Sequence, residues 1–183
     1  VGTTQIANVY ISGIVGKNHD TNGQLDFKVI KNCTNNGNLS TSKESKSAAS
    51  ILLCGITGRL EIAADVVCDK LVNNGDLTHN GTVKGLSLGG ISCYSNKASF
   101  TNCKNTGALT VADEATVSGD ILQIAGLSTQ GLTADKLENC SNSGKIYVGS
   151  KATAGKKSII AGLVAGDTTI GTVSGCYNTA DIE

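Results

Sequence analysis

The chain has 183 residues, and its fifteen basic and fifteen acidic residues give a formal net charge of zero. It therefore offers no basic stripe for nucleic acid or anionic lipid, and no apolar run is long enough to cross a membrane. Trp, Met and Pro are absent and aromatic residues make up 3%, so a core has to be built from Ile, Leu, Val, Ala and Cys. No signal peptide is visible. Because the first residue is Val1 rather than Met, we expect a mature or excised form.

The first element along the chain is a glycine-containing motif, ISGIVG at residues 11–16. It returns as LCGITG, LGGISC, IAGLST and IAGLVA, always as aliphatic, small, Gly, aliphatic, any, small. The glycines at its third position are Gly13, Gly55, Gly90, Gly126 and Gly162. Five copies separated by about 36 residues indicate an internal repeat, which has to be recognised before a fold is assigned.

A second motif, NCTNNGNLS at residues 32–40, alternates with the first and returns as NCKNTGALT and NCSNSGKIY. Its cysteines are Cys33, Cys103, Cys140 and Cys176, with Leu71 in the second copy. Its recurring asparagines are Asn35, Asn73, Asn105, Asn142 and Asn178. The next recurring residues are Gly37, Gly75, Gly107 and Gly144, with Ala180 in the fifth copy. The last are aliphatic: Leu39, Leu77, Leu109, Ile146 and Ile182. All of these lie at every second position, so we expect them on one inward face.

Both motifs are typical of short β-strands, because the residue types alternate with period two between Asn, Gly, Ser and Asp. TPR, ankyrin and HEAT repeats need helices that this sequence does not supply, leucine-rich repeats are shorter, and five propeller blades need more residues. The sequence therefore predicts an all-β fold, a parallel β-solenoid or β-helix of about five coils with a period of about 36 residues.

We interpret the chain as one β-solenoid domain, 1–183. Its five repeats are predicted at approximately 1–40, 41–78, 79–110, 111–147 and 148–183. At the spacing of β-strands, five coils make a rod roughly 24 Å tall.

Equivalent residues of successive coils are expected to stack into ladders. An inward asparagine is costly unless its amide is paired, so we expect each one to hydrogen-bond to the asparagines above and below or to the backbone at a corner. The glycine two residues later suits a bend with positive φ. Ala180 departs from this pattern, which predicts a different last corner or a place at a rim.

The cysteines are interpreted as free, buried core residues. His19 and His79 form no CxxC or HxxxH spacing, which argues against a metal site, and no base stands beside the cysteine ladder to activate a nucleophile. Disulfides stay open as an alternative, although seven cysteines leave at least one unpaired and in-register side chains disfavour the disulfide dihedral. The ladder hypothesis predicts that denatured protein releases all seven thiols without reductant.

The glycine motif also contains an aliphatic ladder on the face opposite its small residues. Its members are Ile11, Leu53, Leu88, Ile124 and Ile160. Two interpretations are open. Either a corner turns this ladder inward, which we favour because an exposed apolar stripe promotes aggregation, or another layer or chain covers it.

The segments ISGIVGK, LGGIS, IIAGLVAG, NCTNNGNLS and NCSNSGKIY resemble GLUG-type and related Gly-Asn-rich repeats of microbial surface, adhesin-like proteins. The resemblance spans essentially the whole chain. It implies an extracellular or cell-surface β-solenoid that serves in attachment, spacing or assembly, as a stalk segment or a filament subunit. It implies no catalytic, cofactor-binding or metal-binding residue, and it leaves a host or cell-surface receptor or a glycan as a candidate partner.

The competing functions are a carbohydrate-active β-helix enzyme and a carbohydrate-binding module. The acidic residues are scattered over non-equivalent positions, and the one adjacent pair, Asp113–Glu114, fits a solvated turn. The tyrosines Tyr10, Tyr94, Tyr147 and Tyr177 are few and dispersed for an aromatic platform. Thr57, Ser92 and Ser128 hint at an ice-binding face, but Val15 and Val164 interrupt the ladder. We therefore predict a protein that is not an enzyme and uses no cofactor.

The last expectation concerns the ends of the solenoid. Soluble solenoids usually cap their exposed strand edges with a helix or a charged segment, and neither end of this sequence has one. We therefore expect end-to-end stacking of separate copies, or neighbouring repeats of a longer chain that cover both ends.

Overall fold

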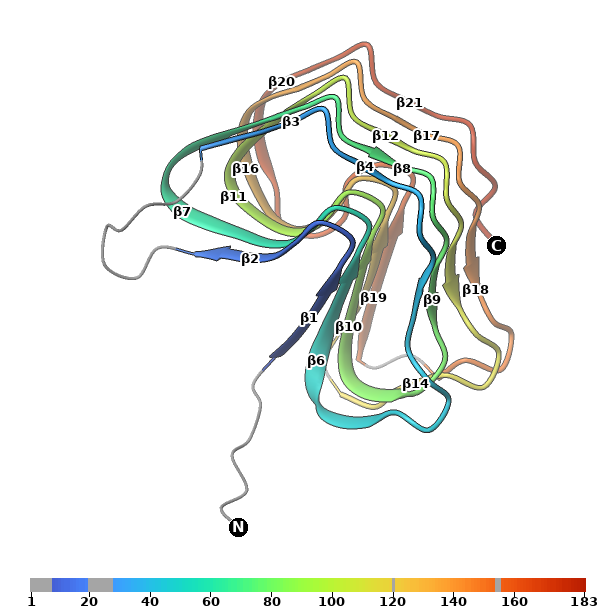
Figure 1. Cartoon of the computed structure of the whole chain (residues 1–183). Helices are drawn as coiled ribbons and strands as arrows, with labels where there is room; N and C mark the ends of the chain where they lie inside the picture. Colours follow the sequence, from blue (N-terminus) through green and yellow to red (C-terminus); the bar gives the residue numbers. More distant parts are fainter. Residues whose placement is uncertain (1–7, 20–27, 120, 154–155) are drawn as a thin grey trace.

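The computed structural model of the chain describes residues 8–19, 28–119, 121–153 and 156–183. These residues form the strands β1–β21 and no helix, and the strands pair in parallel as a β-solenoid. In Figure 1 the coils lie one behind another along the solenoid axis. The predicted fold class and the period of about 36 residues are confirmed. The count of about five coils needs correction, because the five copies of each motif are five rungs separated by about four turns.

Four sheets run along the solenoid, and each takes one strand from every rung it spans, apart from one additional short strand in each of sheets A and B. Sheet A carries the glycine motif and consists of β1 (Asn8–Ser12), β6 (Lys46–Cys54), β10 (Thr82–Gly89), β15 (Ile121–Ala125) and β19 (Lys157–Ala161), with β14 (Thr116–Val117) beside β10. Sheet B consists of β2 (Val15–His19), β7 (Thr57–Asp69), β11 (Ser92–Thr101), β16 (Ser128–Glu138) and β20 (Thr169–Ser174), with β3 (Val29–Lys31) beside β7.

The asparagine motif forms the two remaining sheets. Sheet C consists of β4 (Thr34–Asn35), β8 (Val72–Asn73), β12 (Lys104–Asn105), β17 (Ser141–Asn142) and β21 (Tyr177–Asn178). Sheet D consists of β5 (Leu39–Ser40), β9 (Leu77–His79), β13 (Leu109–Val111) and β18 (Ile146–Val148), and an isolated bridge joins Ile146 to Ile182. The register is regular here, so equivalent residues of the two motifs stack directly.

Each rung bends sharply between sheet A and sheet B, which gives the cross-section two lobes (Figure 1). One lobe encloses the Phe100 core, which includes Ile56, Leu60, Ile91 and Cys103. The other encloses the Leu88 core, which includes Leu53, Leu77, Leu109 and Ile124. Small and aliphatic residues are enough to fill both cores, because the side chains of each rung pack mainly against those of the rungs above and below.

The bend between sheets A and B decides which way the aliphatic ladder of the glycine motif faces. Leu53, Leu88 and Ile124 are fully buried in the Leu88 core. The inward interpretation of this ladder is therefore confirmed for its central members, while Ile160 in the last rung is 37% exposed.

The expected positive φ at the glycine of the asparagine motif is wrong. Next to this motif the left-handed residues are instead Asn32, Lys70, Asn102 and Asn139, with φ between 51° and 55°, and Gly175 with φ of 60°. These residues come directly before the cysteine position and turn the chain from sheet B into sheet C. Asparagine is enriched in the left-handed region because its short side chain bonds locally.

Candidate functional site

The inward asparagines form a continuous hydrogen-bonded column at the waist between the two lobes. The Nδ2 atom of each one donates to the Oδ1 atom of the next at 2.8 Å, from Asn35 through Asn73, Asn105 and Asn142 to Asn178. Each Nδ2 also donates to the carbonyl oxygen two residues later, at 2.8 to 3.1 Å. Both hydrogens of each amide in the interior are thus paired, which removes the penalty for burying them.

Glycine is required on both sides of this column because the backbone approaches too closely for a side chain. A Cβ atom on Gly90 would overlap the Gly126 carbonyl oxygen and lie 2.5 Å from the Asn105 Cγ atom. A Cβ atom on Gly107 would overlap the Gly75 carbonyl oxygen. The physical reason for these glycines is therefore close contact rather than the left-handed backbone.

The aliphatic members of the asparagine motif stack in sheet D. Leu39 pairs with Leu77, Leu77 with Leu109, and Leu109 with Ile146. The central three are fully buried, whereas Ile182 in the last rung is 48% exposed.

The cysteines of the asparagine motif stack beside the column and are all free thiols. Cys103 and Cys140 are buried, and Cys33 and Cys176 at the two ends are partly exposed. The Cys140 Sγ atom lies 3.4 Å from the Cys103 backbone nitrogen, and Cys176 Sγ lies 3.4 Å from that of Cys140.

Two buried thiols are held in the protonated form, Cys140 of the asparagine motif and Cys68 of β7, which is also free. Burial raises the pKa of Cys68 to about 12. The pKa of Cys140 is raised by the hydrogen bond between Cys140 and Cys103 and by burial. Since the thiolate is the reactive form, these side chains serve as packing atoms.

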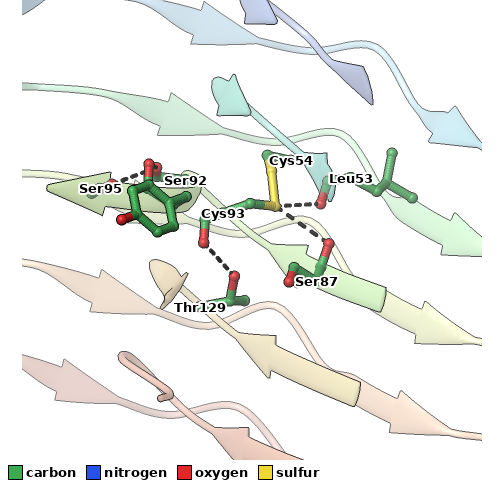
Figure 2. Close-up of a disulfide and its surroundings, with 8 residues drawn as sticks. Leu53, Cys54, Ser87, Ser92, Cys93, Ser95 and Thr129 are labelled. Atoms are coloured by element: carbon green, nitrogen blue, oxygen red, sulfur yellow. Dashed lines mark hydrogen bonds between the residues drawn. A yellow bond between two sulfur atoms is a disulfide. The ribbon is translucent and has the colours of Figure 1, made fainter. Parts of the chain in front are cut away.

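The expectation that all seven cysteines are free is wrong for one pair. Cys54 at the end of β6 and Cys93 in β11 form a disulfide between the second and third rungs, with their Cα atoms 5.9 Å apart (Figure 2). The ladder pattern could not reveal this pair. Cys54 stacks on Gly89 and Cys93 follows Ser92 in sheet B, so the two occupy different repeat positions. Denatured protein should therefore release five thiols without reductant.

Two of the four tyrosines, which the sequence suggests are dispersed, meet in the concave angle between sheets A and B. The Arg59 Nη1 atom donates to Tyr10 Oη at 2.9 Å. The guanidinium carbon lies 4.9 Å from the centre of the Tyr94 ring. Tyr10 and Tyr94 also pack against Leu52 and the disulfide. Because the arginine occupies one face of the Tyr94 ring, this cluster is a clamp between the two sheets rather than an open stacking platform.

The other candidate binding residues are not arranged for a ligand. Thr57, Ser92 and Ser128 are fully buried and cannot form an ice-binding face. The Asp113 carboxylate accepts hydrogen bonds from Tyr147 Oη at 2.9 Å and from the Ser150 backbone N–H at 3.1 Å, which ties it into its turn. Among the described residues, no three His, Cys, Asp or Glu side chains are grouped to hold a metal ion. None of the described segments is a helix suited to span a membrane.

One buried histidine was not singled out as a ladder residue by the repeat pattern. His79 stacks under Val111 and is fully buried, and its Nδ1 atom lies 3.0 Å from Thr41 Oγ1. Burial lowers the pKa of His79, against a smaller opposing effect of the Gly81 backbone. The ring is therefore neutral at pH 7.

The geometry defines a parallel β-solenoid whose most regular feature is the asparagine column with its flanking glycines. No protein-family model, curated protein or solved structure matches the chain. The resemblance to GLUG-type repeats stays a prediction, and function has to be argued from the rungs themselves.

Proposed function

We propose that this chain is a non-enzymatic structural and adhesive solenoid of the extracellular space or cell surface, either a stalk segment or a subunit of a fibre that assembles head to tail. Its proposed role is to act as a spacer of fixed length and to present a repeating surface. Three features of the rungs support this proposal.

The observation that carries the proposal is the state of the last described rung. Val173 occupies the same position as the fully buried Phe100, and Ile182 the same position as the fully buried Leu109. Yet Val173 is 58% exposed and Ile182 is 48% exposed. An apolar strand edge of this kind is a template for another strand. We propose that a further rung of the same pattern covers it.

The interior of the solenoid supports a structural role as well. The column from Asn35 to Asn178 uses its amides for bonds between rungs and for bonds to the carbonyl two residues later, and the buried thiols of Cys68 and Cys140 are protonated packing groups. Polar groups that hydrogen-bond to one another in this way stabilise one arrangement and leave few donors or acceptors for a substrate.

The Cys54–Cys93 disulfide supports the proposed location outside the cell. Disulfides persist in oxidising compartments, whereas the cytosol keeps thiols reduced. The protonated, buried state of Cys68 and Cys140 makes these thiols slow to oxidise in the same environment.

The test is the size of the particles as the protein concentration is raised. Sedimentation velocity should show growing species, and electron micrographs should show rods with an axial repeat of roughly 24 Å, which is five rungs at strand spacing. Dispersed single particles at the highest concentration, with intact chains by mass spectrometry, would contradict assembly. A longer chain that supplies its own further rungs would be recognised as a rod that lengthens with chain length and not with concentration.

A further inference from the structure

We infer that copies of this chain stack in one orientation only, with the first described rung of one copy placed on the last described rung of another. This inference rests on the proposed function, because it names the partner at the open edge as a second copy. It goes further in naming the residues and atoms that meet at the contact and the reason why only the head-to-tail direction fits.

The asparagine column has a direction. At its first member, Oδ1 accepts the Gly37 backbone N–H at 3.2 Å and no other bond from the described residues, since Asn35 Nδ2 is the atom that points to Asn73. At its last member, Oδ1 accepts from Asn142, and Nδ2 donates to the Ala180 carbonyl at 3.0 Å. One end of the column thus keeps a spare acceptor and the other keeps a spare amide hydrogen. Asn178 of one copy can therefore donate to Asn35 of the next.

The backbone of sheet C is compatible with the same contact. Within the chain, Tyr177 N donates to the Cys140 carbonyl, and Thr179 N donates to the Asn142 carbonyl. In the alternating pattern of parallel strands, the carbonyls of Cys176 and Asn178 then point away from the stack at the last rung. At the first rung, Val72 N donates to Cys33, so the Thr34 N–H points away from the stack. A copy stacked in register therefore brings the Thr34 N–H onto the Cys176 carbonyl, as Tyr177 N meets the Cys140 carbonyl within the chain. Because each edge of a parallel strand carries both donors and acceptors, the backbone fits the contact but the asparagine column sets its direction.

The side chains at the two edges are matched because the register repeats. A copy placed on Val173 and Ile182 brings Ile30 and Leu39 over them, since these residues hold the same rung positions. The contact therefore continues the Phe100 core and the Leu88 core and covers the apolar residues that the last rung exposes.

The opposite orientations lack this fit. Two copies that meet by their first rungs bring the Asn35 oxygens together, and two that meet by their last rungs bring the Asn178 amide hydrogens together. Neither arrangement continues the column, and each leaves buried polar atoms unpaired. A contact between two different edges does not close on itself, so it produces a linear filament.

A cysteine-crosslinking experiment tests the polarity. Thr34 and Tyr177 are exposed and belong to one ladder, Thr34–Val72–Lys104–Ser141–Tyr177. The two lie four rungs apart within a chain, roughly 19 Å, but would be neighbours across the proposed contact. Thr34→Cys, Tyr177→Cys and the double variant are prepared with Cys33→Ala and Cys176→Ala, and a short bis-maleimide is added while association is followed by light scattering.

The double variant should give a series of covalent oligomers, and each single variant should remain monomeric on denaturing gels. Covalent dimers of either single variant would show a contact between like edges and overturn the polarity. Scattering that reports association without any crosslink in the double variant would place the contact on another face and also overturn it. Absence of association in every variant and in the unmodified chain would instead contradict the assembly in the proposed function.

A second measurement probes the amide itself. Asn178→Asp keeps the oxygen that accepts from Asn142 but removes the Nδ2 donor, so the association constant should fall at least tenfold at pH 7. Thr179→Asp is the matched control, because it adds the same charge on the exposed side of the same rung. Equal weakening by both variants would reduce the effect to charge repulsion and contradict the role of Asn178.

Discussion

The third and fifth rungs carry the same motifs and differ chiefly in what lies above them. Phe100 and Leu109 in the third rung are fully buried, whereas their counterparts Val173 and Ile182 in the fifth are about half exposed. In a stacked array each unit contacts only its neighbours, so stability is the sum of rung and interface contributions. The contribution of a residue to stability is therefore not fixed by its position in the repeat alone. It also depends on whether the residue has a neighbouring rung on one side or on both.

The largest expected difference comes from the residue that fills the Phe100 core. Phe100→Ala should lower the free energy of unfolding by about 3–5 kcal/mol, because it opens a large cavity between covered rungs. Val173→Ala at the same ladder position should change it by less than about 1 kcal/mol, since the side chain is 58% exposed. Denaturant titrations of both variants measure this. Equal losses would mean that the fifth rung is covered in solution.

The next effect breaks the close contact at the waist. Gly107→Ala should destabilise the fold by about 3 kcal/mol, because the new Cβ atom meets the Gly75 backbone, which cannot move aside cheaply. Gly16→Ala is the control, since nothing lies within 4 Å of a Cβ atom there. A melting temperature that falls equally for both variants would refute the contact explanation.

The third effect interrupts the asparagine column. Asn105→Ala leaves the Asn73 donor and the Asn142 acceptor without their partners inside the waist. We expect a loss of about 2 kcal/mol from these unpaired groups. Asn178→Ala at the rim should lose less, because water can replace the missing amide. Hydrogen exchange of the neighbouring backbone amides would locate the destabilised region. Unchanged exchange around Asn105 would contradict a stabilising role of the column.

The smallest effect is a dependence on pH from the second rung. Burial holds the pKa of His79 below its usual 6.5 in the folded chain. Below pH 6.5 the unfolded state therefore binds a proton that the folded state does not, so stability falls as the pH drops through this value. The loss stops growing once the pH passes below the lowered pKa of the folded state. His79→Val, which copies Val111 in the next rung, should remove this part of the pH dependence in denaturant titrations.

The repeat order and the partners along the axis could be predicted because stacking is a one-dimensional problem. Once Asn35 and Asn73 are recognised as equivalent, the hydrogen bond between them follows from the spacing of the rungs. The shape of the cross-section could not be predicted in this way. It depends on contacts between different sides of a rung, such as Gly90 against Asn105, which the period does not encode.

The positions that break the repeat were the least predictable. The left-handed turn before sheet C recurs in every rung, but at Lys70 it uses a residue that is neither asparagine nor glycine, and no side-chain alternation marks it. The Tyr10–Arg59–Tyr94 clamp joins three rungs through residue types that do not recur at these positions in the other rungs. Such residues show their partners only when the bend between sheets A and B is known.

The disulfide between the second and third rungs also sets how the chain can be stretched. Parallel rungs pulled from one end peel off one after another, because each is held only to its neighbour. The Cys54–Cys93 bond closes a segment with a sequence separation of 39, so this stretch cannot lengthen under tension. Roughly 130 Å of extended chain is withheld in this way and becomes accessible only after the bond is reduced. In an oxidising environment, unfolding under tension should therefore halt at the middle of the solenoid.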